Sequence, residues 1–446
     1  MNHARVKALK GDGKTTSKKA IKSGRASNNL SPHDSPLASM LTSPRTSKPP
    51  SRATSDVSDG SGSDGEPDSD DDMLQSLHSD ASGTSGHDGD RSSVDTQALI
   101  EQLKDRKHNN SDAREHLLEN YIKALRTRFS NDALDWLSEA GAQLADIFLR
   151  DANRAPTARE RLLSLKAYEL TIMTAQDVDV FDAGQRRLKA ILVDDDDEDC
   201  KEHALYALSL TALYAGGGEE AALDLMEYFI EIVQSDGETA EAYDSTAVVA
   251  AAMRAWTWLA AHVDDYSALA DTAMDAIVDQ LDSSVVEVQS LAGEAIALIF
   301  EASRAHESET GEPFQLPYDP RRLAGRVAQL VKQSGGGGSS RALARSDRRS
   351  LKETLRGVTT SLERGVGPGY STAEDEEGRV YGYRQYINLA GSTARIESWS
   401  LLVRWNMLKL VFKSGVVLHA QTNPTAMECI EDASFKANDG AWKKGR

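Results

Sequence analysis

The chain is poor in the residues that stabilise small secreted domains, bind structural metals or cross membranes. Its 446 residues include only two cysteines, Cys200 and Cys429, and no CxxC pair. A disulfide framework or a zinc module is therefore not expected, and a reducing compartment is favoured. No run reaches the ~18 apolar residues of a membrane helix, and the lysine-rich start lacks the apolar core of a secretory signal. We expect a protein of the cytoplasm and nucleus with no membrane partner.

Sequence motifs of catalysis and nucleotide binding are missing as well. There is no HExxH, no GxSxG, no Walker loop and no GxGxxG behind a strand. The acidic run at 194–199 does not space its carboxylates around a turn, as a site for a hard cation does, so a solvated loop is the favoured interpretation. We expect no enzyme, no catalytic residue, no cofactor, no metal and no small-molecule substrate.

Charge and hydropathy divide the chain in two. The net charge is −19, and residues 1–93 show almost no apolar periodicity. This segment cannot bury enough apolar surface to offset its conformational entropy, so we predict a disordered tail. It begins basic, with seven Lys or Arg between Lys7 and Arg25, and the run from Asp56 to Asp90 is acidic and contains no Lys or Arg. The basic block suits a nuclear-import signal or a nucleic-acid arm and, equally, a plain solvated tail.

Six serines of this tail have the setting of phosphorylation sites. Three precede a proline and three have an acidic residue three positions later; in chain order they are Ser31, Ser35, Ser43, Ser61, Ser63 and Ser69. A phosphate adds up to about two negative charges, which would change the contacts of a disordered segment. These serines are therefore candidate regulatory sites.

From residue 94 onward, apolar residues recur every three or four positions, which is the pattern of amphipathic helices. Short polar breaks separate the helices and lie at 194–197, 216–218, 235–237, 264–265 and 282–284. Pro156 is expected at the first position of a helix, where its missing N–H costs nothing. Helical spacing resumes at 321–332.

A self-comparison reveals a repeat of about 40 residues. The pattern Ala-x-x-Ala-x-x-large occurs three times after a looser copy, and the central alanines are Ala167, Ala207, Ala255 and Ala295, separated by 40, 48 and 40 residues. This period is typical of HEAT and armadillo units, whose small inner residues let helices approach closely. We predict an all-α fold, an armadillo/HEAT-like α-solenoid over 94–333, with a compact helical bundle as the alternative. Trp258 is expected in the core rather than on a nucleic-acid platform.

A Gly/Ser run at 334–340 is predicted to be a flexible linker, because no Gly-Lys-Ser/Thr follows it as in a phosphate loop. A small mixed C-terminal module is expected at 341–432, followed by a tail at 433–446. Within the module, alternation of apolar and polar residues predicts hairpin strands at 386–389 and 394–397. Helical spacing then predicts a helix at 399–412, with Gly415 as its C-terminal stop.

The start of this module is the most basic segment of the folded half. Its cations are Arg341, Arg345, Arg348, Arg349, Lys352 and Arg356. If 347–364 is a helix, most of these cations lie on one side and an apolar stripe lies on another. The stripe consists of Leu351, Leu355, Val358 and Leu362. A basic helix face in an acidic protein is a candidate contact for RNA or another polyanion, and an intramolecular partner of the acidic repeats is an equally weighted interpretation.

Three segments stand in a specific order in the C-terminal half. They are Arg345-Ser-Asp-Arg-Arg-Ser-Leu351, Gly391-Ser-Thr-Ala-Arg-Ile-Glu-Ser-Trp399 and Phe412-Lys-Ser-Gly-Val-Val-Leu-His-Ala-Gln-Thr-Asn423. This order resembles the C-terminal domain of the interferon-related developmental regulator family. Trp399, Gly415, His419 and Asn423 match the family's pattern in order, and a structural role is the favoured interpretation of His419. The region 95–312 is similar to the family's armadillo-like N-terminal domain. The chain departs from the pattern in its basic helix, which lacks a glutamine, and in an insert at 365–378.

The resemblance implies regulation of gene expression rather than catalysis. Members of the family are associated with nuclear transcriptional co-regulation and with translationally inactive ribosomes. The leading hypothesis is a scaffold whose solenoid surface binds protein partners and whose basic C-terminal region binds a ribosome or an RNA–protein complex. One alternative is a nuclear co-regulator whose acidic solenoid binds basic chromatin proteins without RNA. Another is an armadillo-type transport adaptor, although the regularly spaced Trp-Asn pairs of such adaptors are absent.

Overall fold

Helices dominate the part of the chain that the structure describes. The computed structural model describes residues 96–105, 109–175, 178–333, 345–369, 373–374, 380–381 and 385–437. These residues belong to one compact unit of the chain. The predicted tail with its candidate serines, the predicted linker at 334–340 and Arg341 lie outside them.

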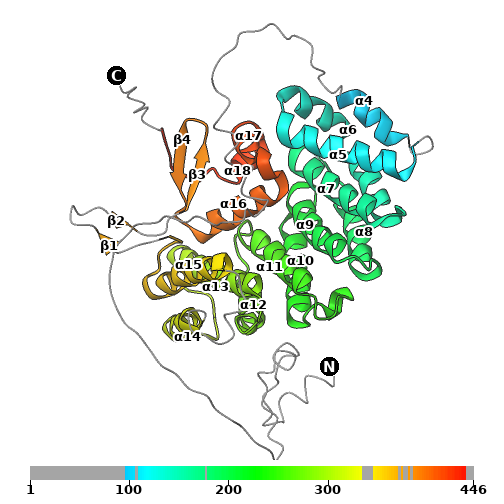
Figure 1. Ribbon diagram of the computed structural model, residues 1–446. Helices are drawn as coiled ribbons and strands as arrows, with labels where there is room; N and C mark the ends of the chain where they lie inside the picture. Colours follow the sequence, from blue (N-terminus) through cyan, green and yellow to red (C-terminus); the bar gives the residue numbers. More distant parts are fainter. Residues whose placement is uncertain are drawn as a thin grey trace, which may run out of the picture. The chain divides into compact units, whose positions relative to one another are not determined.

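Helices of the described chain follow one another in packed pairs (Figure 1). The pairs are α4 (Thr96–Lys104) with α5 (Ser111–Arg128), α6 (Asn131–Arg154) with α7 (Ala158–Thr174), α8 (Phe181–Asp194) with α9 (Glu198–Tyr214), α10 (Gly218–Gln234) with α11 (Thr246–Ala260), α12 (Ser267–Gln280) with α13 (Val286–Thr310), and α14 (Pro320–Gln333) with α15 (Arg345–Arg364). A 3-10 turn, Glu238–Ala240, separates α10 from α11.

The pairs stack through the second helix of each pair. Helix α5 contacts α7, and the series continues through α9, α11 and α13 to α15; we call these six helices the inner layer. The first helices form an outer layer, in which α4 contacts α6, α6 contacts α8, and α10 contacts α12. Stacked pairs in two layers are the arrangement of an α-solenoid, so the predicted fold class is confirmed.

The repeated alanines lie where the inner helices meet. Ala167, Ala207, Ala255 and Ala295 belong to α7, α9, α11 and α13, and all are fully buried. A methyl side chain lets neighbouring helices approach closely, and the large residue three positions later fills the layer between them. Trp258 is one of these large residues and is fully buried, as predicted.

Hydrogen bonds between tyrosine and threonine side chains also repeat along the inner layer. The Tyr121 hydroxyl of α5 hydrogen-bonds the Thr171 hydroxyl of α7 at 2.7 Å, and Tyr168 of α7 contacts Thr211 of α9 in the same way at 2.8 Å. Thr171 in turn donates to the carbonyl of Ala167. Burial raises the pKa of both tyrosines, so they remain neutral donors and acceptors.

The polar breaks lie between helices as predicted, with one correction. Thr157 caps α7 by accepting from the amide of Glu160, so Pro156 stands just before the cap and not at the first helical position. In the acidic run, Asp197 caps α9 by accepting from the Cys200 amide, and Asp195 pairs with Arg161 at 2.7 Å. The run is thus a loop and a helix cap.

The C-terminal part contains more elements than the sequence indicates. Antiparallel strands β3 (Tyr386–Leu389), β4 (Ser392–Arg395) and β5 (Phe435–Ala437) form a sheet in that order, and β1 (Ala373–Glu374) pairs with β2 (Val380–Tyr381). The predicted hairpin is present, but its second strand begins two residues earlier than expected. The helices are α16 (Trp399–Phe412), α17 (Val416–Thr422) and α18 (Pro424–Glu428).

Gly415 does not stop α16 in the way that the sequence suggested. The helix ends at Phe412, and Lys413 has a positive φ of 48°. Gly415 has φ −87° and lies in a 3-10 turn, Lys413–Gly415, that leads directly into α17. A positive φ at this glycine is therefore not the reason for its presence.

No helix in the described residues is both long and apolar enough to span a bilayer.

A buried ionic cluster fastens α5 to α6 and α7. Arg114 is 2% exposed; it pairs with Asp151 of α6 and donates from Nε to Glu160 Oε1 of α7 at 3.0 Å. Glu160 also accepts from the Ser111 hydroxyl at 2.8 Å. All three charges are out of water, so replacing Arg114 removes the buried cation that both carboxylates share, although Asp151 also contacts the Arg150 Nε at 3.3 Å.

Replacing Arg114 by methionine should therefore lower the free energy of unfolding by about 3–5 kcal/mol. Urea denaturation followed by circular dichroism measures this loss. The matched control is Arg159→Met, because Arg159 pairs with Glu115 and Glu119 but its side chain is 66% exposed. Solvent-exposed pairs contribute little, so the control should unfold nearly like the unchanged protein. Similar losses in both variants would contradict the role of the buried cluster.

Candidate functional site

The basic helix predicted at 347–364 is α15, Arg345–Arg364, the last helix of the inner layer. It packs against α13 and α14. Its predicted apolar stripe is confirmed, since Leu351, Leu355, Val358 and Leu362 are all buried. The predicted division of the chain into a repeat domain and a C-terminal module stays a prediction; in the structure, α15 continues the series of helix pairs.

The predicted cations are distributed unevenly around α15. Arg349 and Arg356 are exposed, Lys352 and Arg348 are partly buried, and Arg345 is the first residue of the helix. We call Arg349, Lys352 and Arg356 the basic face of α15. Arg349 pairs within its own helix with Glu353 at 3.0 Å and remains 80% exposed. Within the described residues, no salt bridge joins the basic face to an acidic residue of α4–α13, and the intramolecular interpretation stays a prediction.

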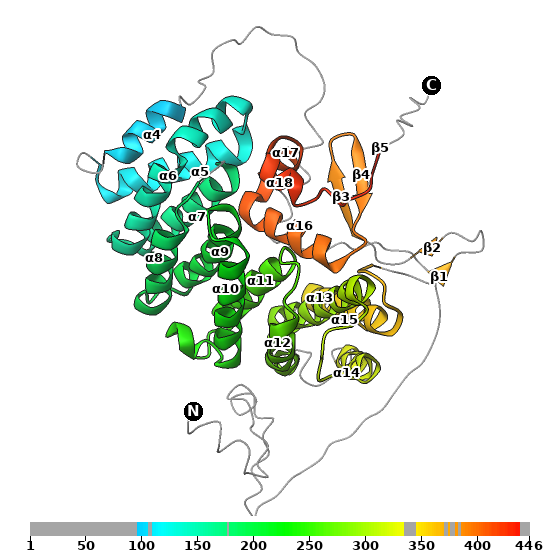
Figure 2. The same cartoon turned by 180° about the vertical axis from the view of Figure 1, so that it is seen from behind.

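The helices that follow lie on the inner layer. Helix α16 contacts α7, α11 and α13, α17 contacts α5, and α18 contacts α7. Figure 2 shows α16 alongside α11 and α13 from the opposite side of Figure 1. The four residues that match the family's C-terminal pattern lie in or beside these helices, and each makes a contact across this interface.

His419 and Asn423 bind the ends of two inner helices. The Nε2–H of His419 donates to the carbonyl of Leu125 at 3.0 Å, and Asn423 Nδ2 donates to the carbonyl of Met173 at 2.8 Å. The Asn423 amide also lies 3.2 Å from His419 Nδ1, which accepts in this arrangement. Burial lowers the pKa of His419 to about 4, so the ring is neutral, and it stacks on Phe412 with centroids 3.8 Å apart. Both ring nitrogens of His419 are therefore engaged in hydrogen bonds within the protein.

Trp399 fixes the beginning of α16. Its indole N–H donates to the Ser361 hydroxyl of α15 at 2.6 Å. The backbone amides of Trp399 and Ser400 donate to the carboxylate of Glu301 on α13, both at 2.9 Å. A carboxylate at a helix N-terminus satisfies amides that have no partner inside the helix and meets the positive end of its dipole.

Gly415 permits a backbone contact that no other residue allows. A Cβ at this position would lie 1.9 Å from the carbonyl oxygen of Arg126 on α5. The Arg126 side chain completes the contact, because its Nε donates to the carbonyl of Val411 at 3.0 Å. The partners Arg126, Glu301 and Ser361 were not identified from the sequence, where nothing distinguishes them from other surface residues of a helix.

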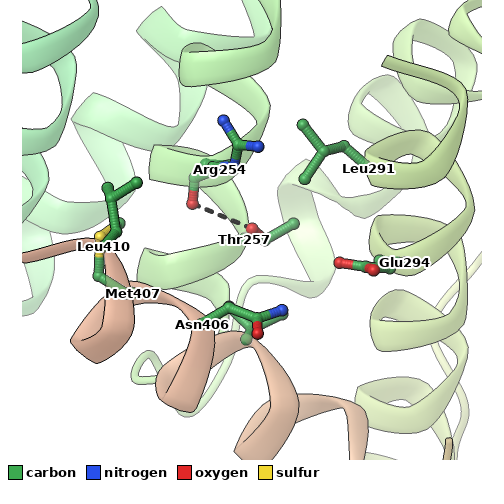
Figure 3. A pocket seen from close by; sticks show the side chains of 8 residues that line it. Arg254, Thr257, Leu291, Glu294, Asn406, Met407 and Leu410 are labelled. Carbon is green, nitrogen blue, oxygen red and sulfur yellow. Dashed lines mark hydrogen bonds between the residues drawn. The ribbon is translucent and has the colours of Figure 1, made fainter. Parts of the chain in front are cut away.

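A small pocket lies where α16 meets α11 and α13 (Figure 3). Its lining includes the apolar Leu291, Met407 and Leu410 and the polar Arg254 and Glu294. Arg254 pairs with Glu287 and donates to the Tyr206 hydroxyl at 3.2 Å. Glu294 makes no hydrogen bond or salt bridge within the described residues, and burial raises the pKa of its carboxyl to about 7.

Stacked helix pairs, with further helices docked on their inner layer, define a mainly helical repeat protein. The chain belongs to the interferon-related developmental regulator family, whose profile matches residues 58–363. This is a family of regulatory helical proteins and not a known family of enzymes. The match ends within the last turn of α15.

Two further similarities are more distant. An uncharacterized protein of Schizosaccharomyces pombe (strain 972) is 23% identical over 294 residues, which are 63% of this chain and 62% of that protein. The chain thus spans less than two thirds of this relative's length. The crystal structure of an engineered protein aligns with 60% of this chain and 97% of its own, at 14% identity and a TM-score of 0.34.

The contact between Gly415 and Arg126 can be tested by adding one methyl group. Gly415→Ala should weaken the docking of α16–α18 by about 1–3 kcal/mol, because the backbones must separate to admit the Cβ. Hydrogen–deuterium exchange should then be faster in α17 and α18 and unchanged in α9. The control is Gly325→Ala on α14, where a Cβ meets nothing within 4 Å. Equal protection of α17 in both variants would show that the close contact is not needed.

Glu294 should make stability depend on pH. Its folded-state pKa of about 7 lies above the ordinary value of 4.5, so the folded protein holds a proton that the unfolded chain releases between these values. Stability from this group is therefore lost as the pH rises from about 4.5 to 7. Glu294→Gln should remove that loss and stabilise the protein relative to the unchanged chain by on the order of 3 kcal/mol at pH 8. Urea denaturation at several pH values measures the difference, and a constant difference across the range would contradict it.

Proposed function

We propose that the protein is a non-enzymatic regulator of gene expression that binds a ribosome, or another RNA–protein complex, through the basic face of α15. The observation that supports this proposal is the exposure of Arg349 and Arg356 on a helix whose opposite stripe is fully packed. Arginine and lysine on a rigid helix are suited to phosphate contacts, which supply most of the affinity of sequence-independent binding.

The charge of the preceding repeats favours binding at this end of the stack. Residues 218–285 contain fifteen Asp or Glu residues and a single Lys or Arg, which is Arg254. Glu219, Asp224 and Glu227 of α10 are exposed, as is Asp275 of α12. Such a surface repels a polyanion, whereas α15 attracts it, so an RNA-containing partner would be oriented toward α15. On this proposal the protein acts in the cytoplasm and the nucleus, and the remaining solenoid surface is available for protein partners.

A second candidate function follows from the same acidic surface. A nuclear co-regulator could use the carboxylates of α10 and α12 to bind basic chromatin-associated proteins without any RNA. The third candidate, an armadillo-type transport adaptor, requires exposed tryptophans along a groove. Trp256 and Trp258 are both fully buried, so they are not available for that purpose.

Reversing the basic face of α15 distinguishes the first two functions. The triple variant Arg349→Glu, Lys352→Glu, Arg356→Glu should lose most of its co-sedimentation with ribosomes at about 0.15 M salt, because phosphate contacts become repulsive. Sucrose-gradient profiles of the tagged protein from growing and starved cells, with nuclear fractions run beside them, measure this loss.

The matched control reverses the charge of three basic residues that lie far from α15 in the stack of helix pairs. Lys123 and Arg186 are exposed and Lys166 is partly buried, on α5, α8 and α7. Changing all three to glutamate alters the net charge by the same amount and should leave co-sedimentation intact. Retention of ribosomes by the α15 variant would refute the proposal and favour the co-regulator.

A further inference from the structure

We propose that α14 and α15 together form one two-helix face that binds the phosphate backbones of duplex RNA. This inference rests on the proposed function and names the form of RNA that the site takes. The two-helix face consists of Arg321 and Lys332 of α14 with Arg349, Lys352 and Arg356 of α15. The sequence did not single out α14 as part of any site.

Helix α14 is as basic as its neighbour. Four of its fourteen residues are Arg or Lys, and none is acidic. Arg321, Arg322 and Lys332 are exposed and make no salt bridge within the described part of the chain. Arg326 differs, because it pairs at 3.0 Å with Asp282 in the loop after α12. Three cations of this helix are therefore free to contact a partner.

The helical period places two of these cations on one side. Arg321 and Lys332 are eleven residues apart, which is close to three turns, so they lie on the same side of α14 and ~16 Å apart along it. The side of α14 that carries Arg321 and Lys332 is rotated by roughly 120° about the helix axis from Arg326. Arg326 itself points toward Asp282, which follows α12. Helix α15 packs against α14, whereas Arg321 and Lys332 are exposed to solvent.

Helix α15 presents a parallel set of charges. Arg349 and Arg356 are seven residues apart, about two turns, and both are exposed. Packed helices lie ~8–10 Å apart, so two rows of exposed cations on α14 and α15 are close enough to form the single surface of this proposal. The two helices together carry ten basic residues and three acidic ones. This is a dense positive surface in a protein of net charge −19.

The composition of the face selects between forms of RNA. Neither α14 nor α15 contains a phenylalanine, tyrosine, tryptophan or histidine. Proteins that hold single strands stack the unpaired bases on aromatic side chains, and this face has none. Duplex RNA exposes its phosphates and is recognised mainly by shape and backbone contacts, which rows of cations can supply.

The test uses the full chain and three probes of one sequence. These are an RNA duplex of about 20 base pairs, its separated strands and the corresponding DNA duplex, with binding measured by fluorescence anisotropy at about 0.15 M salt. The RNA duplex should bind at least ~10-fold more tightly than either single strand. The double variant Arg321→Glu, Lys332→Glu should weaken duplex binding at least ~10-fold and reduce the slope of log affinity against log salt by about two. Lys123→Glu with Arg186→Glu is the control of equal charge and should behave like the unchanged chain.

Each outcome separates this inference from the proposed function. Equal affinity for single strands and duplex, or tighter binding to DNA, overturns the assignment of duplex RNA. If the α14 variant retains duplex binding while the α15 variant loses ribosomes, the two-helix face is wrong and the proposed function stands. If the α15 variant keeps its ribosomes, the proposed function itself is wrong. Loss of duplex binding in the α14 variant, with circular dichroism unchanged, supports the inference.

Discussion

The close approach of the inner helices is the constraint on which the rest of the structure depends. A buried alanine at the centre of each of four helices sets the spacing, and a buried large residue three positions later fills it. Dense packing of this kind maximises dispersion contacts and leaves little room for a larger side chain at the alanine positions. The tyrosine–threonine bonds between consecutive helices occur only because the helices are this close. Without that spacing, neither the docked helices nor the two basic helices at the end of the stack would be held in place.

The docking of α16–α18 shows how a repeat protein can use its own backbone as a binding partner. Three of its contacts are made to main-chain carbonyls, those of Leu125, Met173 and Arg126. Carbonyls at the ends of helices lack partners inside the helix, so side-chain donors from elsewhere can satisfy them. The consequence for function is that part of the inner layer is already occupied, and the outer layer, α14 and α15 remain for other molecules.

Much of the helical architecture could be predicted from the sequence, because period and composition are local properties. The repeat of alanines located the inner helices, and the leucine stripe of α15 identified its buried side correctly. The contacts of the candidate site were harder to predict from the sequence. The sequence indicated that Trp399, Gly415, His419 and Asn423 belong to a pattern, but their partners lie 38 to almost 300 residues away. Arg126 and Glu301 look like ordinary surface residues until the fold brings them to α16. Gly415 was misinterpreted as a helix stop because a steric requirement between distant backbones leaves no local signal. Pro156 was wrongly placed at the first helical position because the N-cap formed by the next residue, Thr157, was not recognised.

The docked C-terminal helices also change the way in which such a stack should unfold. In a simple repeat array each unit touches only its neighbours, so its stability is a sum of local terms and its ends can fray independently. Here α16–α18 contact α5, α7, α11 and α13 at once, which links the first repeats to the last ones. Contacts between residues nearly 300 positions apart raise the mean sequence separation of the fold and should slow its formation. The docked helices should therefore couple the opening of the first repeats to that of α11 and α13.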